Sequence, residues 1–335
     1  MRISMQDYDI MIGKKSINNL ENSIKAIYDA KDIFIVTDDH VFDLYHEKIT
    51  SILKSYHLHF VSIKPGEKSK SYKVYLDTIE KLIEKGIKRN HLLIALGGGV
   101  VGDLTGFIAA TLYRGIPFIQ IPTTLLAQVD SSIGGKVGID LKEGKNLVGS
   151  FYTPKFVIID PDFLETLNDR EYRQGVAEMI KAGLIRDKNL FDYFKENILV
   201  SEKEILMALQ VKREIVLKDP FEKNERMLLN FGHTYGHAIE KKFKYETYKH
   251  GEAISYGMLI ALEEGINQKI TPAYLYDEVK EVLIKQQLVQ EPFFKKEDLE
   301  SYILTDKKNT SKDFHFICLK DIGNSVITKL KVGEK

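Results

Sequence analysis

Residues 92–114 read LLIALGGGVVGDLTGFIAATLYR, and this stretch does most to define the fold. Five apolar residues run into three glycines at positions 97–99, and a helical pattern begins near Val100. Glycines between a strand and a helix let backbone N–H groups approach a phosphate, which the helix dipole also attracts. The spacing is not the usual G-x-G-x-x-G, and three glycines can equally form a plain tight turn. Gly102 and Asp103 can likewise serve only packing and capping. The stretch predicts a strand–turn–helix unit with a candidate phosphate-binding turn.

Short β-branched runs recur through the first half of the chain. We predict buried strands at residues 33–37, 60–63, 92–96, 118–121 and 156–159. Between the second and third runs, apolar residues at roughly helical spacing predict a helix over residues 72–86, with Gly86 as its stop. Strand, helix and strand in alternation imply a parallel α/β sheet. Asp38 directly follows the first strand, where an acidic residue suits a nucleotide ribose or a helix cap.

The second half has a different character. Helical patterns cover residues 170–185, 204–217, 233–242, 251–266 and 273–285, and a terminal β pair is predicted at residues 314–319 and 326–330. No internal repeat and no low-complexity linker separates the halves. We therefore expect two domains: an α/β Rossmann-like nucleotide-binding domain over residues 1–160 and a mostly helical domain over residues 161–335.

Composition excludes several classes of function. The 48 Lys and Arg residues equal the 48 Asp and Glu residues, so the chain lacks the cationic excess of a general nucleic-acid binder. No uninterrupted apolar run reaches about 18 residues, so no membrane span is expected, and the first residues do not resemble a signal peptide. Cys318 is the single cysteine and cannot form an intrachain disulfide. These features favour a cytoplasmic protein.

Histidines and one carboxylate form a candidate metal site. His233 and His237 are four residues apart, so both can face one side of a helix, and His250 opens the next helical segment. Glu178 lies among apolar residues on another predicted helix and could complete a site of nitrogen and oxygen ligands. Such a set suits Zn²⁺ or Co²⁺ better than Mg²⁺. A single helical histidine is more often structural, and the spacing does not decide whether His237 binds metal or faces a substrate.

Several basic residues interrupt apolar or glycine-rich segments. Each alone reads as an ordinary surface charge, but together they favour a pocket for phosphate or carboxylate groups. They are Arg114, Lys136, Lys145, Lys212 and Arg226, with Asn146 beside Lys145.

These motifs in this order identify a family. The stretch at residues 97–154 resembles the 3-dehydroquinate synthases, which are sugar phosphate cyclases, almost throughout. PGEKSK (65–70), GVAEMIK (175–181), RMLLNFGHTYGHAIE (226–240), HGEAISYGM (250–258) and DKKN (306–309) also match. The resemblance covers about residues 30–325 and implies a Rossmann-like NAD domain, a helical metal domain and a homodimer. One stretch, VGIDLKEGKN, departs from the family pattern but keeps the spacing to Lys145 and Asn146.

The resemblance assigns roles residue by residue. It implies that Glu178, His233 and His250 bind Zn²⁺ or Co²⁺ and that His237 faces the substrate. Implied NAD contacts are Asp38, Glu67, Lys70, Gly98, Gly99, Val100, Asp103, Thr123, Thr124, Lys145, Phe163 and Thr166. Implied catalytic and substrate-binding residues are Asp130, Lys136, Asn146, Lys181, Lys212, Arg226, Asn230, His237 and either Lys307 or Lys308, while Arg114 would reach the partner subunit's site.

The implied reaction closes a phosphorylated seven-carbon sugar acid, 3-deoxy-D-arabino-heptulosonate 7-phosphate, into 3-dehydroquinate with release of phosphate, a step of the shikimate pathway of aromatic amino acid biosynthesis. Another sugar phosphate cyclase, making an inosose, a valiolone or an aminated quinate, is the nearest alternative. A metal-dependent alcohol or glycerol dehydrogenase shares the expected architecture but has no need of so many anion-binding residues. A module that only binds NAD would not need the clustered metal ligands.

Overall fold

The computed structural model describes residues 1–299, 301–302 and 313–331. The chain divides into two compact units, Met1–Leu167 and Asn168–Lys335. The division falls shortly after residue 160, the boundary drawn from the sequence. Within the described residues, no helix combines the length and the apolar character that crossing a membrane requires.

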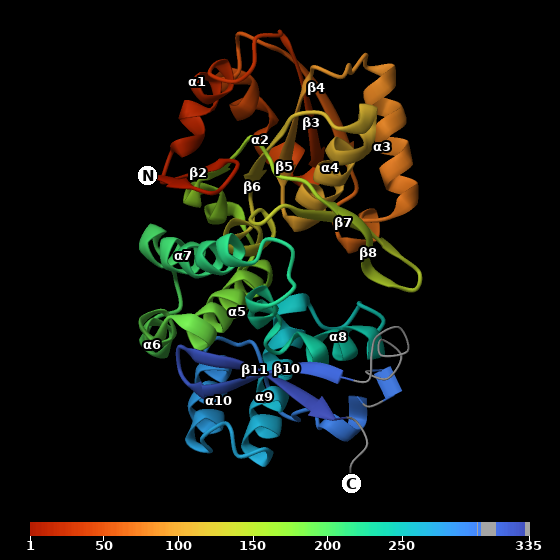
Figure 1. The fold of residues 1–335 in the computed structure, drawn as a ribbon. Helices are drawn as coiled ribbons and strands as arrows, with labels where there is room; N and C mark the ends of the chain where they lie inside the picture. The colour runs from red at the N-terminus through yellow and green to blue at the C-terminus, as the bar shows by residue number, and fades with distance from the viewer. Residues whose placement is uncertain (300, 303–312, 332–335) are drawn as a thin grey trace. The chain divides into compact units, whose positions relative to one another are not determined.

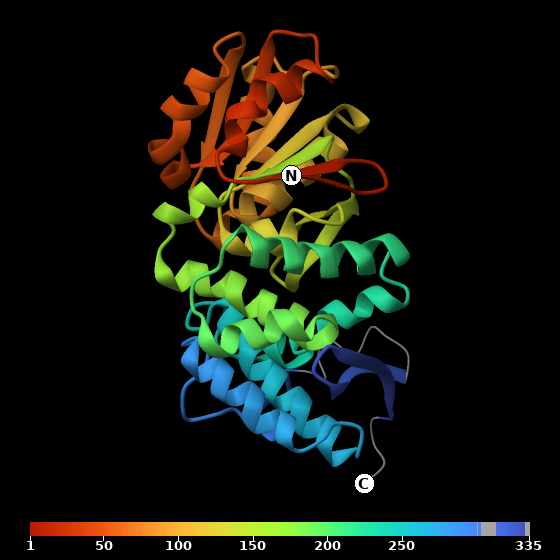
Figure 2. The same cartoon turned by 90° about the vertical axis from the view of Figure 1, so that its left-hand side faces the viewer.

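A seven-stranded sheet forms the centre of the first unit (Figure 1). The strand order is β1-β2-β9-β6-β5-β3-β4, in which β1 and β2 pair antiparallel and every other neighbouring pair is parallel. The strands are β1 (Arg2–Ser4), β2 (Asp9–Ile12), β3 (Asp32–Asp38), β4 (His57–Ile63), β5 (Leu92–Gly97), β6 (Phe118–Pro122) and β9 (Phe156–Ile159). The five strands predicted from sequence are confirmed. The β1–β2 hairpin, red at the edge of the sheet in Figure 2, was not predicted.

Both faces of this sheet are buried under helices. Ile33 and Ile35 of β3 belong to one apolar cluster with residues of α1 (Leu20–Lys25) and α2 (Asp39–Ile52). Phe34 and Val36 belong to a second cluster, with residues of α3 (Tyr72–Glu84) and α4 (Gly99–Thr111). Since successive strand residues point to opposite faces, a fully apolar run is what a strand covered on both sides requires.

The order of the strands reverses at β3. The chain passes from β3 outward to β4 and then returns to β5 on the other side of β3. In open α/β sheets, ligands bind at the carboxyl ends of the strands where such a reversal occurs. Asp38 ends β3 and the glycine turn follows β5, so both lie at this edge of the sheet.

The structure contains a second hairpin that the sequence did not predict. Strands β7 (Lys136–Leu141) and β8 (Gly144–Phe151) pair antiparallel as a separate two-stranded sheet. Most of β8 is exposed, which explains why its sequence lacks a buried-strand pattern.

The second unit is mostly helical, as predicted. The five predicted helices are present with ends shifted by at most two residues: α5 (Asp169–Arg186), α7 (Glu202–Lys218), α8 (His233–Lys242), α9 (His250–Asn267) and α10 (Tyr274–Lys285). The structure adds the short α6 (Lys188–Glu196). The predicted terminal pair is β10 (Asp313–Asp321) and β11 (Asn324–Lys331), blue in Figure 1, which contacts α9 and α5.

Candidate active site

Three helices of the second unit bring their ligand-type side chains to one place. Glu178 lies in the middle of α5, and His233 and His250 are the first residues of α8 and α9. Oε1 of Glu178 is 3.7 Å from Nε2 of His233 and 3.5 Å from Nε2 of His250. One ligand atom from each residue lies within 4.8 Å of the other two. The predicted metal ligands therefore converge, with the carboxylate buried and the two imidazoles partly buried.

Glycines allow α8 and α9 to approach closely enough for this convergence. Gly232 caps α8 with a φ of 79°, a conformation that favours glycine. A Cβ on Gly257 of α9 would lie 2.1 Å from the carbonyl oxygen of Gly232 and 2.7 Å from the backbone nitrogen of Gly236. The two helices meet backbone to backbone, which holds the histidines at their N-termini near each other.

The charge state of the cluster is set by its neighbours. Burial alone would raise the pKa of the Glu178 carboxyl, but the ammonium of Lys181 and neighbouring His250 lower it to about 2. Burial and the nearby charge of Lys181 hold the pKa of His233 well below its ordinary value. Glu178 and His233 are thus held in the ionised and neutral forms that bind a metal ion, whereas the carboxylates of Glu178 and Glu240 raise the pKa of His250 to about 9, so His250 must lose a proton when it binds one.

A second acidic residue, which the sequence analysis did not single out, lies beside His250. Oε1 of Glu240, in α8, is 3.7 Å from Nδ1 of His250 and is buried. His237, Glu240 and His250 form another group with ligand atoms within 4.8 Å, and it shares His250 with the first. His237 itself is exposed, one turn after His233.

Buried basic residues of the second unit lie around a short loop. Lys212 in α7 and Arg226 in a 3-10 helix (Glu225–Asn230) are both buried. Asp219 shapes the preceding loop by accepting hydrogen bonds from the backbone N–H groups of Lys223, Asn224 and Arg226 at 3.0, 2.7 and 3.0 Å. Nδ2 of Asn230 donates to Oε1 of Glu222 at 2.6 Å, a partner that the sequence analysis did not name.

In the first unit the glycine turn has the form expected of a phosphate cradle. Gly98 is the N-cap of α4, directly after β5, and Thr123 donates its N–H to the carbonyl of Gly97 at 3.0 Å. A Cβ added to Gly98 would lie 3.0 Å from Cγ2 of Thr124, so the segment that contains Thr124 passes close to the glycine turn. Gly99 and Val100 lie in the first turn of α4, where the helix N–H groups have no helical partners.

Five of the predicted residues of this unit form one polar cluster. Nζ of Lys70 is 2.5 Å from both Oδ2 of Asp103 and Oδ1 of Asn146, and Nζ of Lys145 is 3.4 Å from Oε1 of Glu67. Burial lowers the pKa of Lys70, but the carboxylates of Asp103 and Glu67 outweigh it and raise the pKa. The cation of Lys70 is therefore retained.

Asp140 belongs to this cluster although its sequence position gave no signal. Its Oδ1 accepts the backbone N–H of Asn146 at 2.8 Å, and Asn146 has a left-handed φ of 56°. The Asp140 N–H donates in turn to the carbonyl of Lys70 at 2.7 Å. Asp140 thus fixes the turn that presents Asn146 to Lys70.

The other predicted residues of the first unit have varied surroundings. Asp38 caps α2 by accepting the N–H of Val41, so the capping alternative left open by the sequence is observed. Phe163 is buried against Tyr45, so any NAD contact there would come from its backbone. The hydroxyl of Thr166 hydrogen-bonds to that of Tyr45 at 2.5 Å. Asp130 is partly buried, whereas Lys136 and Arg114 are exposed. Lys307 and Lys308 lie outside the described residues.

Solved structures with this fold include two synthases. The chain has a TM-score of 0.88 and 26% identity to 2-deoxy-scyllo-inosose synthase complexed with carbaglucose-6-phosphate, NAD⁺ and Co²⁺, covering 99% of this chain and 96% of that one. It has a TM-score of 0.86 and 25% identity to 2-epi-5-epi-valiolone synthase from Streptomyces hygroscopicus with NAD⁺ and Zn²⁺, covering 97% and 93%. The fold is therefore that of the sugar phosphate cyclases, as predicted.

Sequence comparison narrows the class to one family. Residues 60–174 match the family model for the 3-dehydroquinate synthase N-terminal domain, and residues 175–309 match the C-terminal one. The chain is 42% identical to 3-dehydroquinate synthase of Clostridium acetobutylicum, covering 100% of this chain and 96% of that protein. For the protein of the same name from Clostridium botulinum the identity is 43%, covering 98% and 96%. The chain belongs to the 3-dehydroquinate synthase family, which confirms the resemblance read from its motifs.

Proposed function

We propose that this chain converts 3-deoxy-D-arabino-heptulosonate 7-phosphate to 3-dehydroquinate and phosphate, as an NAD- and metal-dependent carbon–oxygen lyase of the shikimate pathway. The observation that carries the proposal is the convergence of Glu178, His233 and His250 from three helices, in a member of this family. The relatives named 3-dehydroquinate synthase match the chain over nearly their whole length, which supports the same reaction.

The residues present fit a divalent ion. Oε1 of Glu178 is buried and makes no hydrogen bond among the described residues, although an ionised buried oxygen needs a partner. Two imidazoles and a carboxylate are a donor set that suits Zn²⁺ or Co²⁺. Glu178, His233 and His250 would hold the ion. The chemistry that an ion supplies at such a site is Lewis acidity, which lowers the pKa of a substrate hydroxyl.

The first unit fits NAD. The glycine turn, the N-terminus of α4 and the end of β3 lie together at the strand-order reversal, where dinucleotides bind in related sheets. The chemistry that NAD supplies is reversible hydride uptake, so the overall reaction needs no net oxidant. Asp38, Glu67, Lys70, Asp103 and Lys145 remain proposed contacts.

The chain's own residues of the second unit would bind and orient the substrate. Lys212 and Arg226 are cations held in buried positions, where they can bind phosphate or carboxylate groups strongly. The imidazole of His237 is exposed beside the candidate metal ligands and can accept or donate a proton at its ring nitrogen. Asn230 can donate its amide, as it does to Glu222.

Two further parts of the proposal concern assembly and location. We propose a homodimer in which Arg114 reaches the neighbouring site. Its support is that Arg114 is exposed, in a turn where Tyr113 and Arg114 have left-handed φ values of 51° and 63°. A cytoplasmic location is consistent with a single buried cysteine, Cys318.

The proposal is tested by incubating the purified protein with the heptulosonate phosphate, substoichiometric NAD⁺ and Zn²⁺ or Co²⁺. Phosphate and the carbocyclic product should form in equal amounts without net NADH. Accumulation of NADH would instead indicate a dehydrogenase. Release of product from glucose 6-phosphate, but not from the heptulosonate phosphate, would indicate another cyclase.

A further inference from the structure

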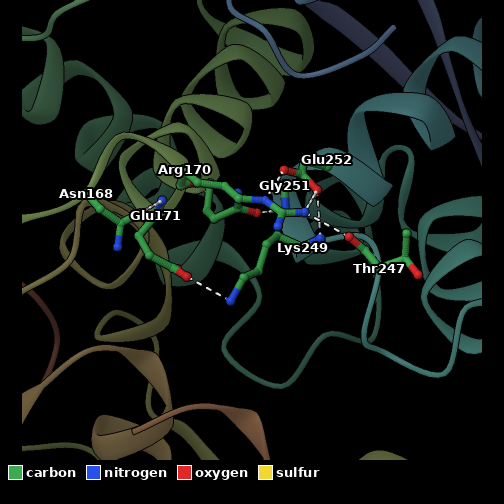
Figure 3. A network of polar contacts seen from close by, with 8 residues as sticks. Asn168, Arg170, Glu171, Thr247, Lys249, Gly251 and Glu252 are labelled. Carbon is green, nitrogen blue, oxygen red and sulfur yellow. Dashed lines mark hydrogen bonds and ion pairs between the residues drawn. The ribbon is translucent and has the colours of Figure 1, made fainter. Parts of the chain in front are cut away.

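The position of His250 depends on how α9 begins, because His250 is its first residue. A histidine at a helix terminus moves with the terminus, which is the part of a helix most prone to fray. Figure 3 shows that polar contacts from the start of α5 surround this terminus. The same helix, α5, carries Glu178.

The first of these contacts is a two-point ion pair. Nε of Arg170 lies 2.7 Å from Oε1 of Glu252, and Nη2 lies 2.8 Å from Oε2 (Figure 3). Nη2 also donates to the carbonyl of Thr247, in the loop before α9, at 2.8 Å. A planar guanidinium on both carboxylate oxygens fixes orientation as well as distance. The nearby pair of Lys249 and Glu171, at 2.8 Å, is more exposed and single, so water screens it.

The second contact is buried. Oε1 of Gln174 accepts the backbone N–H of Gly251 at 2.5 Å, and Nε2 of Gln174 donates to the carbonyl of Arg170 at 2.7 Å. A Cβ on Gly251 would lie 2.7 Å from Cα of Gln174 and 3.0 Å from Cβ of Ala177. The start of α9 therefore rests directly on the backbone of α5.

These contacts occur in register. Arg170, Gln174 and Glu178 are spaced by four residues and so lie along one face of α5. They meet Glu252, Gly251 and His250 in that order, which are consecutive residues of α9 taken in the opposite direction. Two of these three contacts between α5 and α9 involve no candidate metal ligand. They lie next to the third contact, which joins the candidate ligands Glu178 and His250.

We propose that Arg170 and Gln174 are positioning residues that hold His250 at the distance from Glu178 needed to bind a metal ion. The inference rests on the proposed metal site. Outer contacts that orient ligands change metal affinity, typically by about 10–100-fold.

The test is a Co²⁺ titration of the metal-free protein, followed by visible absorption and by competition with a chelator. Arg170→Met should bind Co²⁺ on the order of tenfold more weakly and shift the absorption bands, because the ligand geometry changes. Arg170→Lys, which restores the charge but not the two-point contact, should recover part of the affinity. Glu252→Gln removes the carboxylate charge and keeps its size, and it should weaken binding in the same direction.

The matched control is Lys296→Met. Lys296 pairs with Glu264 at the far end of α9. The N–O distance is 2.7 Å, and the two side chains are 40% and 13% exposed. The pair of Arg170 and Glu252 has the same closest distance and exposures of 47% and 17%. Lys296→Met should leave Co²⁺ affinity and spectrum unchanged.

The outcomes separate this inference from the proposed function. If the unaltered protein binds no Co²⁺, the metal assignment itself fails. If it binds Co²⁺ and Arg170→Met and Glu252→Gln bind it equally well with the same spectrum, the positioning role is wrong. Equal weakening by Lys296→Met would also overturn the inference, since it would show a general effect of lost helix packing.

Discussion

Nζ of Lys181 lies 2.5 Å from Oε2 of Glu178, one turn earlier in α5, and both side chains are only 3% exposed. Because the pKa of Glu178 is lowered to about 2, this carboxylate stays charged in a buried place at all ordinary pH values. Lys181→Met should therefore destabilise the metal-free protein by up to about 3 kcal/mol, the usual penalty for breaking a buried pair, reduced by the cationic His250 that still faces Glu178. Thermal unfolding of metal-free protein measures the loss.

An exposed pair provides the control. Lys218 and Glu214 are separated by 2.8 Å in α7 but are 51% and 47% exposed, so Lys218→Met should change stability by no more than about 0.5 kcal/mol. Adding Zn²⁺ should restore much of the stability of Lys181→Met, since the ion can compensate Glu178. Equal, small losses in both variants would show that the Glu178 charge is not held as described.

The two overlapping groups of possible metal ligands, which share His250, predict that different substitutions abolish metal binding. Glu178→Ala and His233→Ala should yield protein without bound metal, as measured by inductively coupled plasma mass spectrometry, because each removes a ligand from the buried group. His237→Ala should retain the metal and lose turnover. The reverse pattern, with metal lost only in His237→Ala, would favour the group of His237, Glu240 and His250 instead.

The raised pKa of Asp140 predicts that the stability of the protein depends on pH. Burial raises the pKa of its carboxyl to about 6, despite the N–H of Asn146 and the charge of Lys70. An acid whose pKa is higher in the folded state stabilises the fold below its unfolded value, near 4, and this contribution is lost as pH rises through 6. Asp140→Asn keeps an acceptor for Asn146 and removes the titration.

The expected difference is small because the carboxyl is only partly buried, so water screens its charge. We expect Asp140→Asn to melt about 2–4 °C higher than the unaltered protein at pH 7.5, roughly 1 kcal/mol, and at the same temperature at pH 4. A gap in melting temperature that is the same at both pH values would contradict the raised pKa of Asp140. Because the two proteins are compared at the same pH, the other titrating groups affect both melting temperatures alike.

The sequence predicted the parts of the fold in which local pattern and burial agree. The run at residues 33–37 is apolar throughout because β3 is covered on both faces, and the glycines at residues 97–99 mark the passage from β5 to α4. Hairpin β7–β8 was missed because most of β8 faces outward, so burial leaves no alternation in its sequence.

The candidate site was predictable only in part for a similar reason. Motif resemblance identified Lys70 and Asn146, but their contact joins residues 76 positions apart and depends on a hairpin that no local pattern showed. Asp140 and Glu240 escaped notice because a single acidic residue carries no signal until the fold places it beside a partner. The same holds for Arg170, whose role depends on which residue of α9 it meets.

The glycine turn gives a prediction that separates cofactor binding from stability. A methyl group on Gly98 would project at the N-cap of α4, 3.0 Å from the movable methyl of Thr124. Gly98→Ala should lower NAD⁺ affinity at least about tenfold, because the added carbon stands where a phosphate must approach the backbone, while costing less than about 1 kcal/mol in stability. Calorimetric titration with NAD⁺ and thermal unfolding measure the two effects.

Gly106, two turns further along α4, should behave in the opposite way. A Cβ there would lie 2.4 Å from Cγ1 of Val137 and 3.3 Å from Cε2 of Phe118, inside the apolar core. Gly106→Ala should cost about 1–3 kcal/mol in stability through overcrowding, and the folded fraction should bind NAD⁺ normally. If Gly98→Ala bound NAD⁺ as tightly as the unaltered protein, the turn would be only a tight connection between β5 and α4, and the nucleotide would have to bind elsewhere on the first unit.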